Sequence, residues 1–131
     1  MIPFFNYTYS QVRTALLAAY SSMPIGRKLP GKPTFPTTVI NPIDNSQYER
    51  SMDSSSNENH VNAAIQIEVF STKAGSEETE CEAIMTVADD VMRGIGFVRF
   101  FCEFIPTVEG KTRLIARYRA IISKEGLVYR R

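Results

Sequence analysis

Residues whose types could carry out catalysis are sparse in this sequence. His60 is the only histidine, and it lies in a Ser- and Asn-rich stretch where an oriented general base is not expected. Cys81 falls on the apolar side of a predicted helix and Cys102 within an aromatic strand. We therefore expect two buried free thiols in a reducing compartment, with a disulfide as the lesser alternative. Two cysteines and one histidine at these spacings form no metal site.

One segment comes close to a phosphate-binding loop. Residues 26–33, GRKLPGKP, have the G-x-x-x-x-G-K spacing. However, Pro33 stands where such a loop has a metal-binding Ser or Thr, and the prolines exclude the strand and helix that must flank it. Nucleotide binding is therefore not expected.

The placement of charge gives a stronger indication of function. In residues 112–123, TRLIARYRAIIS, alternate side chains share a face, which places Arg113, Arg117 and Arg119 together with Ile115. Like charges in such a row repel, so we expect the arginines to meet acidic groups of a neighbouring subunit. Acidic side chains gather at the start of the preceding predicted helix, where the helix dipole also favours them: Glu77, Glu78, Glu80 and Glu82. These eight residues form the candidate interface, and a sheet face exposed only to solvent is the alternative.

The spacing of apolar residues predicts the elements that carry these side chains. Residues 8–22 are expected to form a helix that begins with a capping box of Thr8 and Gln11. Residues 76–94 have an apolar period of 3.6, which is typical of a second helix that Gly94 and Gly96 can end. Strands are expected at 37–40, 61–71, 97–105 and 112–123. A Pro-rich linker at 24–36 and a flexible, exposed loop at 44–60 join them.

This order, α-β-β-α-β-β, predicts one α+β domain over residues 1–131, an α/β protein in the broad sense. Its sheet is expected to be small and mainly antiparallel, with about four strands and two helices packed on one side. The second helix should bury its apolar stripe against the strand face opposite the arginines. The expected core contains Ile65, Ile67, Ile84, Met85, Ala88, Val91, Leu114 and Tyr118.

Composition limits the classes of partner. The chain has 15 basic and 14 acidic residues and a net charge of +1, which argues against nucleic-acid or membrane binding over the whole surface. The N-terminal residues lack the features of a signal peptide, and no run of apolar residues is long enough to span a membrane.

Two segments resemble a known protein family. The run from Ala63 to Phe100 contains IQIEVFS and CEAIMTVADDVM and leads through a Gly-Phe pair into a strand. It resembles the corresponding part of the tail-completion proteins of long-tailed bacteriophages, also called tail terminators or head–tail joining proteins. Residues 113–122, with the segment ARYRA, extend the resemblance.

The resemblance implies a structural virion protein of the phage tail and neck, assembled in the host cytoplasm. Such a protein forms a homo-oligomeric, hexameric ring, caps the tail tube and joins it to the head-side connector or stopper protein, with DNA passing through its lumen. It implies no catalysis, no cofactor, no metal and no membrane contact. The residues leave open a small nucleic-acid-binding module that uses the arginine face, although the aromatic residues of 97–105 are expected to divide between both faces. A small enzyme is the third hypothesis.

Overall fold

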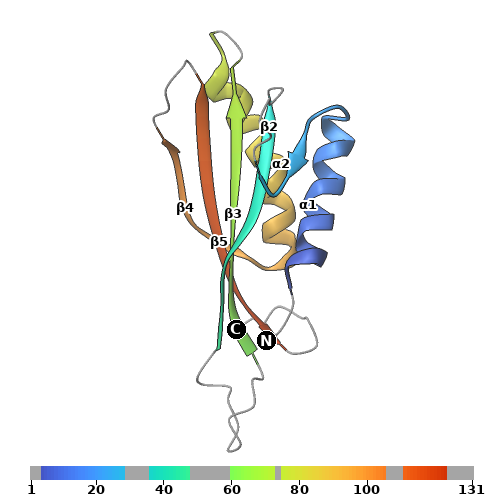
Figure 1. Ribbon diagram of the computed structural model, residues 1–131, viewed down its shortest axis with the longest axis vertical. Coiled ribbons are helices and arrows are strands. Elements are labelled where there is room, and N and C mark those ends of the chain that lie inside the picture. The colour runs from blue at the N-terminus through green and yellow to red at the C-terminus, as the bar shows by residue number, and fades with distance from the viewer. Residues whose placement is uncertain (1–3, 29–35, 48–59, 73–74, 106–110, 124–131) are drawn as a thin grey trace, which may run out of the picture.

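The structure is a computed structural model that describes residues 4–28, 36–47, 60–72, 75–105 and 111–123. Its helices are α1 (Phe5–Ala19) and α2 (Glu77–Ile95). Its strands are β1 (Ile25–Gly26), β2 (Thr37–Gln47), β3 (His60–Ser71), β4 (Val98–Ile105) and β5 (Thr112–Ser123). The predicted α+β class is confirmed, with both helices on the same side of one sheet (Figure 1).

The sheet has five described strands in the order β1-β2-β3-β5-β4. β1 pairs with β2 in parallel, and all the other neighbours are antiparallel. β1 was not predicted, because its two residues lie in the Pro- and Gly-rich segment where no periodicity can be read. The long pairing of β3 with β5 places residues 60–71 opposite 112–123 and forms the centre of the sheet.

The core lies between the sheet and α2, as the apolar periods predict. Ile84, Met85, Ala88 and Met92 are buried on one side of α2, which packs on β3, β5 and α1. Every predicted core residue is buried except Val91, which is only half-buried beside the cluster. The stripe of α2 is therefore narrower than the sequence predicts. Gly96 ends the helix at a φ of 118°, a left-handed conformation that favours glycine.

The first helix begins earlier than the capping signal predicts. Phe4 is the N-cap residue and no side chain caps the helix. Thr8 lies inside the first turns, where its hydroxyl donates to the carbonyl of Phe4 at 3.2 Å. The capping box of Thr8 and Gln11 is therefore wrong. Phe4 is 8% exposed and belongs to the core, so tertiary packing rather than side-chain capping accounts for this start.

The strand predicted at 37–40 continues to Gln47 instead of ending at Pro42. The pairing register with β3 shifts between Pro42 and Asp44, so one extra residue forms a bulge. Proline is tolerated at this point because β1 pairs only with Thr38 and Val39, which leaves β2 at the edge of the sheet. Residues 44–47 and His60 are therefore strand, not loop, and the remainder of the predicted loop lies outside the described residues.

A buried hydrogen-bonded cluster ties α2 to the sheet. Asp89 is 7% exposed and accepts a hydrogen bond of 2.8 Å from the hydroxyl of Tyr118, which is fully buried. Arg99 of β4 and Arg93 of α2 each place a guanidinium nitrogen 2.9 Å from the same carboxylate group. Burial and the neighbouring Asp89 raise the pKa of Tyr118, so its hydroxyl stays a donor. The cluster fixes the rotation of α2 over β5.

Replacing Tyr118→Phe is expected to lower the free energy of unfolding by about 2 kcal/mol, because it removes a buried hydrogen bond to a charged acceptor. Urea denaturation measures this loss. Tyr7→Phe is the matched control, since Tyr7 is 62% exposed, and it should change stability very little. Equal stability of the two variants would show that the Tyr118–Asp89 bond contributes nothing.

Candidate assembly interface

The side of the sheet opposite the helices, which we call the open face, carries the predicted arginine row. No element in the described part of the chain covers it (Figure 1). The antiparallel registers and the alternation of side chains place several groups there together. They include Val39, Gln66, Glu68, Phe70, Phe101, Glu103, Arg113, Ile115, Arg117 and Arg119. The arginines therefore lie on the face opposite the helices, as predicted.

Two of the arginines find polar partners within the same subunit. Arg113 binds Glu68 through Nε at 2.9 Å and through a terminal nitrogen at 2.7 Å. Gln66 links this pair to the next arginine: its amide nitrogen donates to Glu68 at 2.6 Å, and its oxygen accepts from Arg117 Nε at 2.9 Å. Arg113 was expected to meet an acidic group of a neighbouring subunit, but the carboxylate that it contacts belongs to its own subunit. Its charge is balanced by a carboxylate that is 9% exposed.

The other partners of the arginines are aromatic rings. Arg117 lies with Cζ 4.8 Å from the ring centre of Phe101, and Arg119 lies 5.5 Å from that of Phe100. These two phenylalanines are neighbours in sequence and would alternate between faces in a regular strand. The register of β4 against β5 shifts between Arg99 and Phe101, so a bulge turns both rings toward the arginines. The aromatic residues of 97–105 still divide between both faces as predicted, because Phe97 belongs to the core and Phe104 packs against it on the other side of the sheet.

Exposure divides the open face into a shielded centre and an accessible edge. Ile115 is 4% exposed although no helix covers it, so it offers almost no surface to a neighbour. At the β4 edge, Val98 is 59% exposed and Phe100 is 46% exposed, and Arg119 is exposed beside them. We call Val98, Phe100, Phe101, Arg117 and Arg119 the edge patch. It combines two cations with exposed apolar surface, and within the described residues Arg119 contacts no carboxylate.

The acidic residues at the start of α2 belong to the helix layer. Glu78 and Glu82 are exposed and Glu77 is half-buried. Glu80 accepts a hydrogen bond of 2.7 Å from the hydroxyl of Ser71 at the end of β3, which gives it a local role. The predicted acidic and basic groups therefore lie on opposite layers of the subunit.

The two cysteines differ in accessibility. Both are free thiols, and Cys81 is fully buried as predicted, with its sulfur 3.6 Å from the carbonyl oxygen of Val69. Burial, with the nearby Glu80, raises the pKa of Cys81 to about 12. Cys102 is exposed, which corrects the expectation of two buried thiols. It lies on an edge strand, and the aromatic composition of that strand did not reveal its exposure.

A thiol reagent should distinguish these two groups. At pH 8 the native protein is expected to react through Cys102 alone with Ellman's reagent, because the thiolate is the reactive form and Cys81 is buried with a raised pKa. Unfolding in guanidinium should release the second thiol. The Cys102→Ser variant should show no rapidly reacting thiol in the native state. Two rapid equivalents from the folded wild type would contradict the burial of Cys81.

The residue types that could carry out chemistry form no metal site within the part of the chain that the structure describes. His60 opens β3 and pairs with Ser123, and its side chain lies outside the described part of the structure. Over the residues that the structure describes, no three His, Cys, Asp or Glu side chains gather in a manner that could hold a metal ion. Of the near-match to a phosphate loop, only residues 26–28 are described, and Gly26 ends the short β1. Neither described helix has the length and apolar character needed to cross a bilayer.

Comparison with known proteins gives no match to a protein family and none to a curated protein.

Proposed function

We propose that this protein is a structural component of a phage tail, a ring-forming tail terminator that caps the tail tube and joins it to the head-side connector. The single observation that carries the proposal is the edge patch, an exposed surface of Val98, Phe100 and Arg119 beside Arg117 on an edge strand. The resemblance of residues 63–100 and 113–122 to tail-completion proteins supplies the particular class. The protein performs no chemistry and needs no cofactor in this role.

The separation of charge supports head-to-tail association. The edge patch lies on the open face, whereas Glu77, Glu78 and Glu82 lie on the helix layer. Such surfaces complement each other and not themselves, so repeated contacts of this kind close into a ring or continue as a filament. Because Glu68 already balances Arg113, the positive charge that a neighbour meets comes from Arg117 and Arg119, and the exposed Glu103 on the same face offsets part of it. A six-membered ring, as in the resembling family, is the assembly we propose.

The proposed ring has partners of two kinds. One end contacts the tail tube and the other contacts the connector of the head, with DNA passing through the lumen. Its location is the virion, between head and tail.

Co-sedimentation with purified tail tubes tests this role directly: the protein should pellet with the tubes at a fixed, low stoichiometry, because only tube ends bind it. Light scattering of the same sample gives the mass of the bound assembly. Binding along the whole tube, or no binding, would contradict the proposal.

Deletion of residues 51–58 is expected to preserve the fold and to impair the joining of tails to heads. β2 and β3 pair continuously from Gln47 opposite Val61 to Thr37 opposite Phe70, apart from the bulge, so the sheet does not depend on the segment that joins them. Its Ser- and Asn-rich composition offers little apolar surface to bury, which favours a role in contact with a partner. Circular dichroism checks the fold, and mixing of tails with heads checks joining. Loss of folding on deletion would show a structural role instead.

A specific observation also favours the second candidate, a single-strand nucleic-acid-binding surface. The bulge in β4 presents the exposed ring of Phe100 and the ring of Phe101 on the open face, each with an arginine against it. Bases stack on such rings, and arginines bind the phosphates. Fluorescence anisotropy with labelled single-stranded DNA at increasing salt tests this. Micromolar binding that weakens with salt, and that Phe100→Ala removes, would favour this candidate over ring formation.

A further inference from the structure

Two strands on opposite sides of the sheet centre, β2 and β4, each contain a bulge that exposes a large apolar side chain (Figure 1). In β2 the extra residue is Ile43, which is 46% exposed, and in β4 it is the equally exposed Phe100. Val98, two residues before Phe100, is more exposed than either. Apolar surface at both edges of one sheet indicates two contact surfaces on the same subunit.

The pairing registers place the two bulges at nearly the same level of the sheet. Following the pairs across β2, β3, β5 and β4 gives two adjacent rows, first Asp44, Ala64, Arg119 and Val98, then Pro42, Ile65, Tyr118 and Arg99. Ile43 lies between these rows, and Phe100 follows the second. The two bulge residues are therefore about one row apart, or ~3.3 Å along the strands.

An equal level at both edges is what a closed ring requires. Rotation about an axis parallel to the strands keeps every row at its height, so β4 of one subunit comes to face β2 of the next. Because each of the three pairings from β2 to β4 is antiparallel, the two facing strands run in opposite directions. A difference in level would instead produce a helical filament.

β1 leaves this part of the β2 edge accessible. It pairs only with Thr38 and Val39, and from Asn41 onward no described strand pairs with the outer side of β2. The uncovered part contains Ile43 and Asp44. The rows in which β2 is uncovered are the same rows in which β4 carries its exposed apolar side chains.

The two edges also match in charge. Beside Ile43 lies Asp44, and beside Phe100 lies Arg119, and both charged side chains are exposed. Asp44 and Arg119 belong to one row and therefore share the open face. Each edge thus combines one apolar side chain with one charge, and the two charges have opposite sign. Because bulges interrupt the backbone ladder, such edges meet through side chains and not through continuous strand pairing.

We propose that Phe100 and Arg119 of one subunit contact Ile43 and Asp44 of an adjacent copy of the chain. This inference rests on the self-association in the proposed function and names the two surfaces that meet. Each subunit offers one surface of each kind at opposite edges of its sheet, so the contact is head-to-tail.

Disulfide trapping tests the contact in a Cys102→Ser chain, in which the remaining Cys81 is buried. Ile43→Cys and Val98→Cys are introduced together, and the protein is oxidised with diamide, both alone and with tail tubes. Within one subunit the two positions are three strand spacings apart, about 14 Å. A disulfide needs Cα atoms within about 7 Å, so it can form only between subunits. We expect a ladder of linked chains on a non-reducing gel.

Single-cysteine variants establish the direction of the contact. Ile43→Cys alone and Val98→Cys alone should give no linked chains, and a mixture of the two should give dimers only. Ala83→Cys, at an exposed position on α2, should give no ladder when it replaces Ile43→Cys. Dimers from either single variant would show a two-fold contact and overturn the proposal, and so would the absence of a ladder both with and without tubes.

An exchange of charge tests the ion pair. Arg119→Asp in the trapping variant should reduce the yield of the ladder several-fold, and adding Asp44→Arg should restore it. No recovery in the exchanged variant would show that Asp44 is not the partner and overturn the proposal. A ladder from a protein that does not cap tails would contradict the proposed function and leave this contact standing, and capping without a ladder would do the reverse.

Discussion

Reversing the charge of the two arginines of the edge patch, Arg117→Glu with Arg119→Glu, is expected to preserve the fold and to abolish tail capping. Arg117 is half-buried and Arg119 exposed, and neither pairs with a carboxylate in the described part of the chain, so the stability change should stay within roughly 2 kcal/mol. Capping should fail because the edge patch would then repel the acidic partner surface that it is proposed to meet. Electron microscopy of assembled tails measures this as abnormal tail length.

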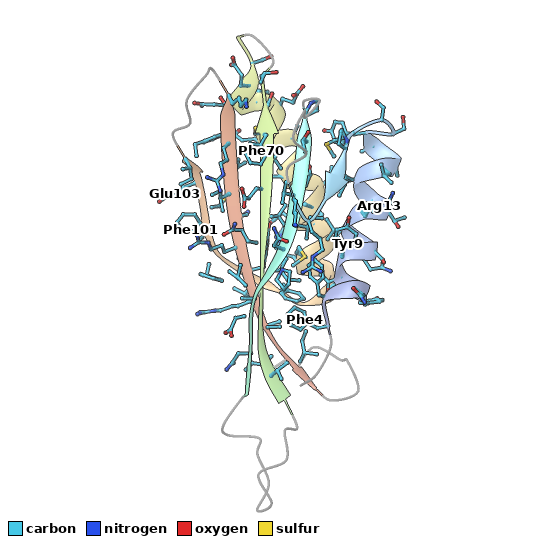
Figure 2. All side chains as sticks on the ribbon, in the orientation of Figure 1. Phe4, Tyr9, Arg13, Phe70, Phe101 and Glu103 are labelled. Atoms are coloured by element: carbon cyan, nitrogen blue, oxygen red, sulfur yellow. The ribbon has the colours of Figure 1, made fainter. Side chains whose placement is uncertain are left out.

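A matched reversal on the other side of the molecule controls for total charge. Arg13→Glu with Lys28→Glu changes the net charge by the same amount, and both residues are exposed. Arg13 lies on α1, far across the molecule from Phe101 and Glu103 on β4 (Figure 2). This variant should cap tails normally. If the Arg117 and Arg119 variant gave tails of normal length, the edge patch would be only solvent-exposed surface with no partner. The main physical argument for assembly would then fail.

Ile84→Asp is expected to unfold the protein. Ile84 is fully buried between α2 and the sheet, where a carboxylate would be left without water or a partner. The cost is several kcal/mol, which is comparable to the whole stability of a small domain. Circular dichroism and thermal denaturation should show no cooperative transition.

Ala83→Asp is the matched control for this substitution. Ala83 precedes Ile84 on the same helix and is exposed. The same carboxylate at that position should leave the protein folded, with a loss of less than about 1 kcal/mol. A folded Ile84→Asp variant with wild-type thermal stability would show that α2 buries a different side.

The spacing of apolar residues in the sequence was sufficient to predict the central strand β5 and the helix α2. The bounds of β5 follow directly from alternation over 112–123, and the apolar stripe of α2 predicts both its length and its buried side. These elements are long, and each has one buried side, so the pattern repeats often enough to be read. The exposed and buried sides of the arginine strand were predicted for the same reason.

The features that the sequence did not reveal depend on pairing between distant segments. The link from Arg113 to Glu68 joins β5 to β3, and no local pattern indicates which strands are neighbours. The bulges at Pro42–Asp44 and Arg99–Phe101 change which face a side chain occupies. The regular alternation of side chains therefore no longer predicts their faces beyond these points. The exposure of Phe100 and Cys102 follows from the edge position of β4, which is a property of the whole sheet. For this reason the edge patch emerges only from the structure.

Electron microscopy of tail tubes mixed with the wild-type protein tests the central claim most directly. Tubes that polymerise without the protein should grow to variable, excessive lengths. When the protein is added we expect each tube to end in a ring at one end, and tube length to become fixed. Tubes that continue to lengthen in its presence, with no density at their ends, would contradict the proposed role as a tail terminator.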